Sequence, residues 1–133
     1  MPVTRLLVVD DDPNTRSLII ATLKQHGRVI HEADNAIDAL HLARQTNPHI
    51  LILDLGLPGL YDGFNLLEAL EKEAQFRKLH VLIESGWSDE EDLLRAKRLG
   101  ADAFIIKPFL PSQLLQTVAL IEKRIENIIV ITP

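Results

Sequence analysis

Short runs of apolar residues alternate along the chain with longer stretches in which apolar residues recur every three or four positions. The runs are too short for helices, and most of them lack the polar alternation of a strand that has one face in water. We therefore expect strands that are buried on both faces, as in a parallel sheet. The runs cover residues 6–9, 29–30, 50–53, 81–83 and 104–106.

The stretches between these runs have the period of amphipathic helices. Asp12 followed by Pro13 is typical of a helix N-cap with proline at the first helical position. Gly27 and Gly100 stand where the first and fourth helices should end, since glycine readily adopts the left-handed conformation found there. The apolar faces of the five predicted helices contain Ile19 and Leu23; Ala36, Ile37, Leu40 and Ala43; Leu66, Leu67 and Leu70; Leu93 and Leu94; and Leu114, Leu115, Val118 and Ile121.

Five successive strand–helix units predict an α/β fold, a doubly wound five-stranded parallel sheet with five helices on its two faces. We expect residues 1–126 to form this single domain. Residues 128–131 are apolar and are expected to follow the last helix. The segment 127–133 is then a C-terminal tail folded back on the domain, the start of a linker to an output domain, or a strand for self-association.

The composition fits one globular domain and excludes several kinds of functional site. The 133 residues include 47% apolar residues, 14 Lys plus Arg against 19 Asp plus Glu, and no cysteine. The lack of cysteine excludes a disulfide framework, a thiolate zinc site and a cysteine nucleophile. The net charge of -5 argues against non-specific nucleic-acid binding, and no apolar run approaches the ~20 residues of a membrane span. We expect a cytoplasmic domain with no membrane and no direct nucleic-acid partner.

Polar residues follow four of the five predicted strands, at the carboxyl edge where open α/β sheets bind their ligands. Carboxylates gathered at this edge repel one another unless a cation holds them. An all-oxygen ligand set, with no cysteine and no suitably spaced histidine pair, favours Mg²⁺. These strand-end residues are Asp10, Asp11 and Asp12 after the first strand, Asp54 after the third, Ser85 after the fourth and Lys107 after the fifth.

A carboxylate can act as a nucleophile toward phosphorus, and phosphoryl transfer needs little beyond in-line positioning and neutralised oxygen atoms. The strand-end residues therefore predict an aspartyl-phosphate site with Asp54 as the acceptor. Taken singly, Asp12 would be a helix cap, Ser85 a turn hydroxyl and Lys107 a solvated strand end. Their joint placement at four strand ends supports the functional interpretation.

Three stretches occur in a specific order and spacing: LLVVDDD at residues 6–12, ILILDLGLP at 50–58 and GADAFIIKPF at 100–109. With them the chain resembles the receiver domains of two-component response regulators, the CheY-like family, over residues 4–125. The resemblance implies a flavodoxin-like fold with strand order 2-1-3-4-5. It also implies a phosphorelay receiver, which is a signalling domain and not an enzyme, with at most autophosphorylation and autodephosphorylation activity.

By this resemblance Asp54 is the phosphoacceptor and also faces a bound Mg²⁺ ion. Asp11 is a direct ligand of that ion, and Asp10 acts on it through water. The carbonyl oxygen of Gly56 completes the set of implied protein ligands.

The resemblance also implies residues that bind the phosphoryl group and respond to it. Ser85 hydrogen-bonds the phosphoryl group, and Lys107 pairs with one of its oxygen atoms. Phe104 is the aromatic residue that rotates inward when Ser85 moves. The bond between Lys107 and Pro108 is expected to be cis, which is accessible for a peptide bond that precedes proline.

The implied phosphodonor is a histidine kinase or a histidine phosphotransfer protein. The added charge of about −2 biases a two-state arrangement of the loop after the fourth strand, the fourth helix and the fifth strand. The fourth helix, fifth strand and fifth helix form the implied readout surface, which includes Arg95, Arg98 and Leu114. This surface would serve a downstream effector, an output domain absent from the chain, or a homodimer.

The sequence departs from the family pattern close to the predicted site. Tyr61 adds one residue to the loop before Asp62, beside the acceptor. Gly56 offers no polar side chain and Trp87 is bulky, at two positions that tune the lifetime of the phosphoryl group. Glu84 adds a negative charge beside an anion site, and the sequence does not explain it. The alternative function is therefore a degenerate receiver that acts by protein contacts without phosphorylation.

Other classes of protein fit these residues less well. The D-x-D pattern after the first strand resembles that of haloacid-dehalogenase phosphatases, but Asn14 stands where they need threonine or valine. An EF-hand would need glycine at Thr15 and glutamate at Ala21. A flavin-binding module on the same fold would leave Lys107 and the acid pair without a role.

Overall fold

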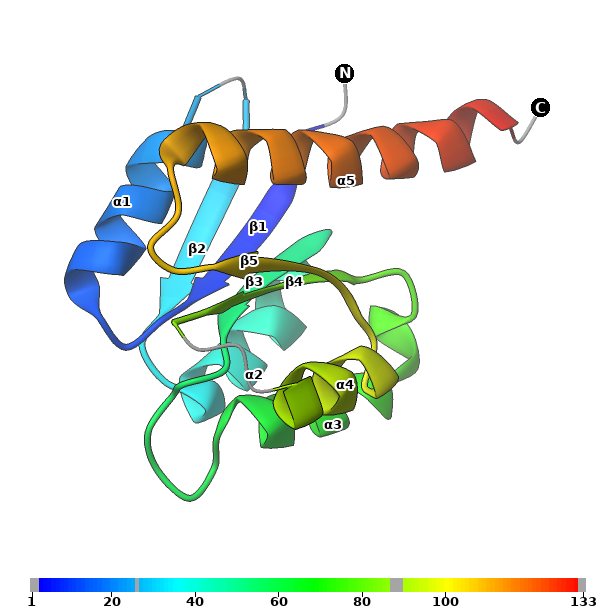
Figure 1. The fold of residues 1–133 in the computed structure, drawn as a ribbon. Helices are drawn as coiled ribbons and strands as arrows, with labels where there is room; N and C mark the ends of the chain where they lie inside the picture. The colour runs from blue at the N-terminus through cyan, green and yellow to red at the C-terminus, as the bar shows by residue number, and fades with distance from the viewer. Residues whose placement is uncertain (1–2, 26, 87–89, 132–133) are drawn as a thin grey trace.

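The structure of the chain is a computed structural model that describes residues 3–25, 27–86 and 90–131, with side chains described as far as residue 125. Strands and helices alternate through these residues (Figure 1). The elements are β1 (Arg5–Val9), α1 (Pro13–Leu23), β2 (Val29–Ala33), α2 (Ala36–Thr46), β3 (Ile50–Asp54), α3 (Gly63–Glu71), the 3₁₀ helix η1 (Ala74–Phe76), β4 (His80–Ser85), α4 (Glu90–Arg98), β5 (Ala101–Ile106) and α5 (Pro111–Ile131).

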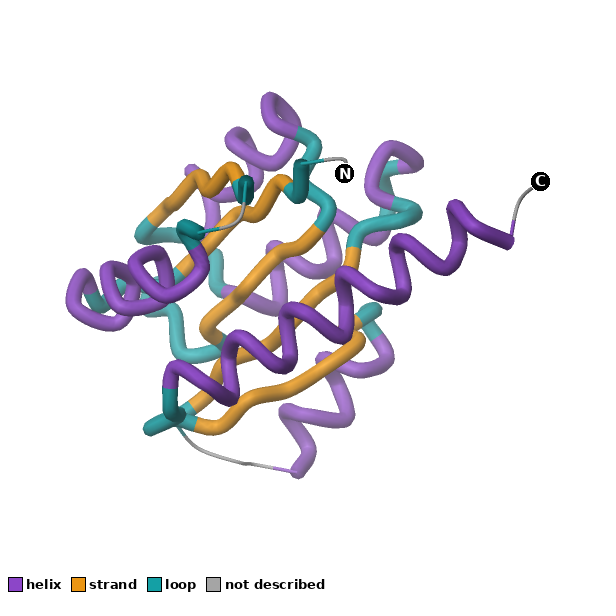
Figure 2. The backbone as a smooth tube through the Cα atoms, turned by 90° about the horizontal axis from the view of Figure 1, so that it is seen from above, coloured by secondary structure: helices purple, strands orange, loops and turns teal. Residues whose placement is uncertain are grey.

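All five strands are parallel and lie in the order β2-β1-β3-β4-β5, which confirms the predicted fold class and strand order. α1 and α5 cover one face of the sheet, and α2, α3 and α4 cover the other (Figure 1 and Figure 2). Leu6 and Val8 of β1 are packed in the cluster beneath α1 and α5, whereas Leu7 and Val9 belong to the cluster on the opposite face. Burial on both faces explains the unbroken apolar runs of the central strands.

The edge strand β5 does not have the predicted burial on both faces. Ile105 is buried, but Phe104 and Ile106 are 36% and 55% exposed. The hydrophobic cluster on the α4 side of the sheet contains Ala101 of β5 but neither of these two exposed residues. The prediction for this strand was wrong because α4 covers only the beginning of it.

Three predicted core positions on the helices are also exposed. Alanines take the positions closest to the sheet: Ala36, Ala39 and Ala43 of α2 and Ala96 of α4 are buried. On α2 and α4, these small side chains let the helix backbone approach the sheet, so the larger apolar residues beside them turn outward. On α5, Leu114, Val118 and Ile121 form the buried face instead. The exposed residues that were expected in the core are Ile37, Leu94 and Leu115.

Helix α5 continues to Ile131, so residues 127–131 extend the helix instead of following it as a separate tail. The expected end of the helix near residue 126 was wrong, because no glycine or proline interrupts the chain between residues 112 and 131. The end of α5 extends past the edge of the sheet (Figure 1). Within the described parts of the chain, no helix combines the length and apolar character needed to cross a membrane.

Side-chain caps begin the helices that follow the acidic ends of β1 and β3. Asp12 caps α1 as predicted, accepting hydrogen bonds from the Asn14 N–H at 3.1 Å and the Thr15 hydroxyl at 2.7 Å. Asp62 and Asn65 form a reciprocal capping box at the start of α3. These local bonds determine where the chain turns away from the carboxyl edge of the sheet.

A partly buried ion pair ties α5 to the amino edge of the sheet. Glu122 of α5 accepts two hydrogen bonds from the Arg28 guanidinium, at 2.8 and 3.1 Å, and a third from the Thr4 hydroxyl at 2.8 Å. The side chains of Arg28 and Glu122 are only 9% and 20% exposed. This bidentate geometry is the stronger form of the arginine–carboxylate contact.

Replacing Glu122 with glutamine should lower the free energy of unfolding by about 1–3 kcal/mol, because the shielded Arg28 charge loses its counter-charge. Urea unfolding followed by circular dichroism measures this change. The Arg95–Glu68 pair provides the control, since its side chains are 52% and 42% exposed. Glu68→Gln should change the free energy by less than about 0.5 kcal/mol, and equal losses in the two variants would contradict the assignment.

Candidate functional site

Acidic residues at the ends of three neighbouring strands lie side by side at the carboxyl edge of the sheet. Asp54 is in register with Glu84 across β3 and β4, and Asp10 follows Val9, which is in register with Leu53. We call Asp10, Asp54 and Glu84 the acidic row; their exposed fractions are 0%, 6% and 0%. Carboxylates directly opposite one another on adjacent strands repel, so the row needs a cation.

Lys107, directly after β5, supplies this cation. Its Nζ lies 3.1 Å from Oδ2 of Asp10, 3.3 Å from Oδ2 of Asp54 and 3.2 Å from Oε1 of Glu84. The contact with Asp10 also has hydrogen-bond geometry. The backbone N–H of Lys107 donates to the carbonyl oxygen of Ser85 at 2.7 Å, which places the lysine beside the end of β4. One ammonium group thus connects the ends of four strands.

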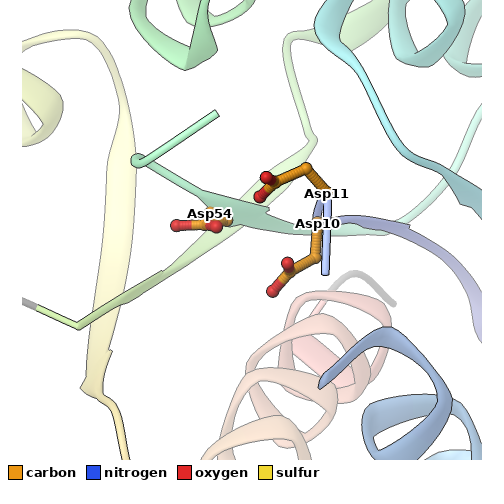
Figure 3. A group of neighbouring side chains, drawn as sticks. All are labelled: Asp10, Asp11 and Asp54. Carbon is orange, nitrogen blue, oxygen red and sulfur yellow. The ribbon is translucent and has the colours of Figure 1, made fainter. Parts of the chain in front are cut away.

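A second group of carboxylates forms a candidate metal site. Asp10, Asp11 and Asp54 offer oxygen atoms that all lie within 4.8 Å of one another. Asp10 and Asp11 leave the end of β1 in different directions, and Asp54 lies beside them on β3 (Figure 3). Asp11 is exposed, so the group is open to solvent. Three clustered carboxylates with access to water fit the oxygen ligands and retained waters of Mg²⁺.

Backbone donors hold two of these carboxylates in place. The Asp12 N–H donates to Oδ1 of Asp10, and the Gly56 N–H donates to Oδ1 of Asp54, both at 2.8 Å. A side chain at position 56 would begin 3.3 Å from Oδ1 of Asp54, so glycine leaves the space beside the acceptor open. Arg16 was not predicted as a site residue, yet its Nη1 donates to the carbonyl oxygen of Asp10 at 2.8 Å.

The other predicted site residues lie at the ends of β4 and β5. Ser85 is the last residue of β4, one position after Glu84. Phe104 lies within β5 and is partly exposed, and the Lys107–Pro108 peptide bond is cis. Trp87 lies outside the described residues. The predicted roles of Ser85 and Phe104 in phosphoryl binding and switching stay predictions.

Burial and charge together set the protonation of this site. Burial raises the pKa of Asp54 above its usual value, although the Gly56 N–H and the Lys107 charge act against this rise. Burial and the adjacent Asp10 raise the pKa of Glu84 to about 9. Burial alone would lower the pKa of Lys107, but the carboxylates of the acidic row outweigh burial and raise it. Without a bound metal, Lys107 is therefore charged and Glu84 holds its proton at neutral pH.

Sequence reasoning noticed Glu84 as an extra charge but did not find its partner. A signal was present, because Glu84 is an acid inside an apolar strand, one residue before the predicted site residue Ser85. Its contact with Lys107 depends on the register of β4 against β3 and β5. No local pattern in the sequence specifies that register.

Known proteins resemble this chain in sequence and in fold. The chain is 35% identical over 114 residues to the protein PilH of Pseudomonas aeruginosa, which covers 86% of this chain and 93% of PilH. It is 31% identical over 121 residues to the phosphate regulon transcriptional regulatory protein PhoB of Escherichia coli, covering 91% of this chain and 52% of PhoB. The chain therefore spans about half the length of PhoB. The structure of the chemotaxis protein CheY4 of Vibrio cholerae matches with a TM-score of 0.84 and 26% identity, over 90% of this chain and 99% of that one.

The sheet order, the clustered aspartates and the lysine after β5 define a CheY-like signalling domain. The model of the response regulator receiver domain matches residues 6–119. The chain belongs to this family of two-component response regulators. It is thus a signalling domain and not an ordinary enzyme, in a family that binds Mg²⁺ at an acidic cluster such as that of Asp10, Asp11 and Asp54.

The buried Glu84 carboxyl should make the metal-free protein less stable as the pH rises above neutrality. Its pKa of about 9 in the folded chain exceeds its ordinary value of 4.5, so over this range the folded state keeps a proton that the unfolded state releases. Between about pH 7 and about pH 9 the free energy of unfolding should fall by up to about 1.4 kcal/mol per pH unit.

Urea unfolding in the presence of EDTA, repeated across this pH range, measures the slope. Glu84→Gln removes the titrating group and keeps the shape of the side chain, so its slope should be nearly flat. The prediction is wrong if Glu84→Gln and the unchanged chain lose stability in parallel.

Proposed function

We propose that the chain is a phosphorelay receiver that accepts a phosphoryl group on Asp54 from a histidine kinase or a histidine phosphotransfer protein. The geometry around Asp54 supports this function most directly. Its Oδ2 lies 3.3 Å from the Lys107 ammonium, and its carboxyl group also belongs to the cluster with Asp10 and Asp11. A nucleophile with a fixed cation on one side and metal ligands beside it has the groups that phosphoryl transfer requires.

In the transfer, a carboxylate oxygen of Asp54 forms a bond to phosphorus while the bond between phosphorus and the donor's histidine nitrogen breaks. The nitrogen keeps the electron pair of the broken bond, and the product is an aspartyl phosphate. Negative charge spreads over the phosphoryl oxygens during this exchange, and the Lys107 ammonium is placed to stabilise it. The N–H of Gly56 keeps the acceptor carboxyl in a single orientation, and Ser85 would hydrogen-bond the product.

The proposed cofactor is Mg²⁺, held by Asp11, Asp54 and the carbonyl oxygen of Gly56, with Asp10 acting through water. When bound, the ion would supply charge neutralisation for the carboxylates and the phosphoryl oxygens. The exposed Asp11 suits a direct ligand that meets the ion from solvent. Asp10 is fully buried and hydrogen-bonded to Lys107, which suits an indirect contact.

Phosphorylation would add a charge of about −2 beside Ser85 and Lys107. We propose that these residues then move toward the phosphoryl group and that Phe104, now partly exposed, rotates inward. The surface of α4, β5 and α5 would carry the signal to a downstream effector, an output domain or a second copy of the chain. The exposed side chains of Leu94 and Ile106 provide apolar contacts there, whereas Leu114, which was expected on this surface, is fully buried. We place this activity in the cytoplasm.

A degenerate receiver that acts without phosphorylation is not favoured. Such a protein would have no need to keep the acceptor, the metal ligands and the lysine together. Here Asp54, Asp11 and Lys107 are all present, and Asp54 lies within reach of both other residues.

Incubation with acetyl phosphate and Mg²⁺ should add one phosphoryl group to the chain, detected by intact mass. Asp54→Ala should abolish this gain, because it removes the nucleophile. Asp92→Ala, which removes an exposed acid at the start of α4, is the control and should gain phosphate like the unchanged chain. A full gain in Asp54→Ala, or no gain in the unchanged chain with Mg²⁺, would overturn the proposed function.

Mg²⁺ should stabilise the folded chain by about 2.7 kcal/mol when its concentration is about one hundred times its dissociation constant. Asp11→Asn removes the charge of an exposed ligand and should weaken Mg²⁺ binding about tenfold or more. Urea unfolding over a MgCl₂ titration measures both values. Asp34→Asn, at an exposed acid after β2, should respond to Mg²⁺ like the unchanged chain, and an unaltered response in Asp11→Asn would remove that residue from the ligand set.

A further inference from the structure

Glu84 is a buried acid that the proposed phosphotransfer does not use. Its side chain is fully buried, and neither of its carboxyl oxygen atoms accepts a hydrogen bond from the described residues. The Lys107 ammonium lies 3.2 Å from Oε1 of Glu84, without hydrogen-bond direction. A buried carboxyl is costly unless a donor or a cation compensates it.

The other two members of the acidic row have a second partner each. Oδ1 of Asp10 accepts from the Asp12 N–H, and Oδ1 of Asp54 accepts from the Gly56 N–H. Either carboxyl therefore keeps a hydrogen bond when Lys107 moves. Within the described part of the chain, Glu84 has no such backbone donor. Its polar neighbours are Lys107, which can donate, and Asp10, which is itself an acid.

A phosphoryl group on Asp54 would draw Lys107 away from Glu84. The phosphodonor reaches Asp54 from solvent, so the phosphoryl oxygens must lie on the solvent side of the carboxyl group. Glu84 is at the closed side of the site, with no exposed surface, whereas the side chain of Lys107 is 23% exposed. Movement of Nζ toward the phosphoryl oxygens takes away the cation beside Oε1 of Glu84 and leaves that buried oxygen without a donor, which is unfavourable.

We propose that Glu84 is a positioning residue that retains Lys107 in the acidic row and thereby opposes the phosphorylated state. The residue acts through Lys107 and not on the phosphoryl group itself. Its effect is to lower the fraction of chains that are phosphorylated at a given supply of phosphodonor. This inference rests on the proposed function, because it concerns the balance between the two states of Asp54.

Glu84→Val tests the inference, since valine suits a buried strand position and cannot retain the lysine. With acetyl phosphate and Mg²⁺ at steady state, the ratio of phosphorylated to unphosphorylated chain should rise about fivefold or more, which corresponds to about 1 kcal/mol. Intact mass measures this ratio. Glu84→Gln keeps an acceptor oxygen for Lys107 and should give a ratio between those of Glu84→Val and the unchanged chain.

The same substitution in a Lys107→Ala background separates positioning from a general effect on the fold. In that background, Glu84→Val should change the ratio of phosphorylated to unphosphorylated chain by less than about twofold, because Glu84 no longer has a lysine to retain. An equal rise in both backgrounds, or a ratio in Glu84→Val that matches or falls below that of the unchanged chain, would overturn the inference while leaving the proposed function standing. No phosphate on either chain would instead overturn the proposed function.

Discussion

The contact of one lysine ammonium with three buried carboxyl groups is the interaction on which this site depends. Asp10, Asp54 and Glu84 lie at the carboxyl ends of three adjacent strands, where their mutual repulsion would otherwise be strong. Lys107 lies within 3.3 Å of all three and thereby makes their close approach tolerable. Lys107 thereby connects the acceptor Asp54 and the candidate metal ligand Asp10 to the chain that follows β5.

The parallel sheet brings these carboxyl groups together at the edge where the proposed site lies. Every strand runs in the same direction, so the residues that follow the buried apolar segments gather at one edge. The Asp12 and Asp62 caps then turn the chain into α1 and α3 at that edge. The chain matches the response regulator receiver domain over residues 6–119, and the proposed role of the buried Glu84 is to oppose the release of Lys107.

Much of the fold, and the clustering of Asp10, Asp11, Asp54 and Lys107, were predictable, because the signals are local or lie in short motifs. The apolar runs of β1, β3 and β4 predicted strands covered on both faces, and these strands are buried as expected. The Asp12 cap and the order of polar residues at the strand ends were likewise visible in a few neighbouring positions. Asp11 and Asp54 were expected to meet, and the structure brings them together.

The sequence by itself determined which segments form strands and helices and which chemical groups follow them, since periodicity and capping act over a few residues. Only the tertiary structure decided that Phe104 lies open on an edge strand and that Ile37 turns away from the core. It also decided that Glu84 meets Lys107. These outcomes depend on strand register and on which helix covers which part of the sheet, relations between distant parts of the chain that no local pattern specifies.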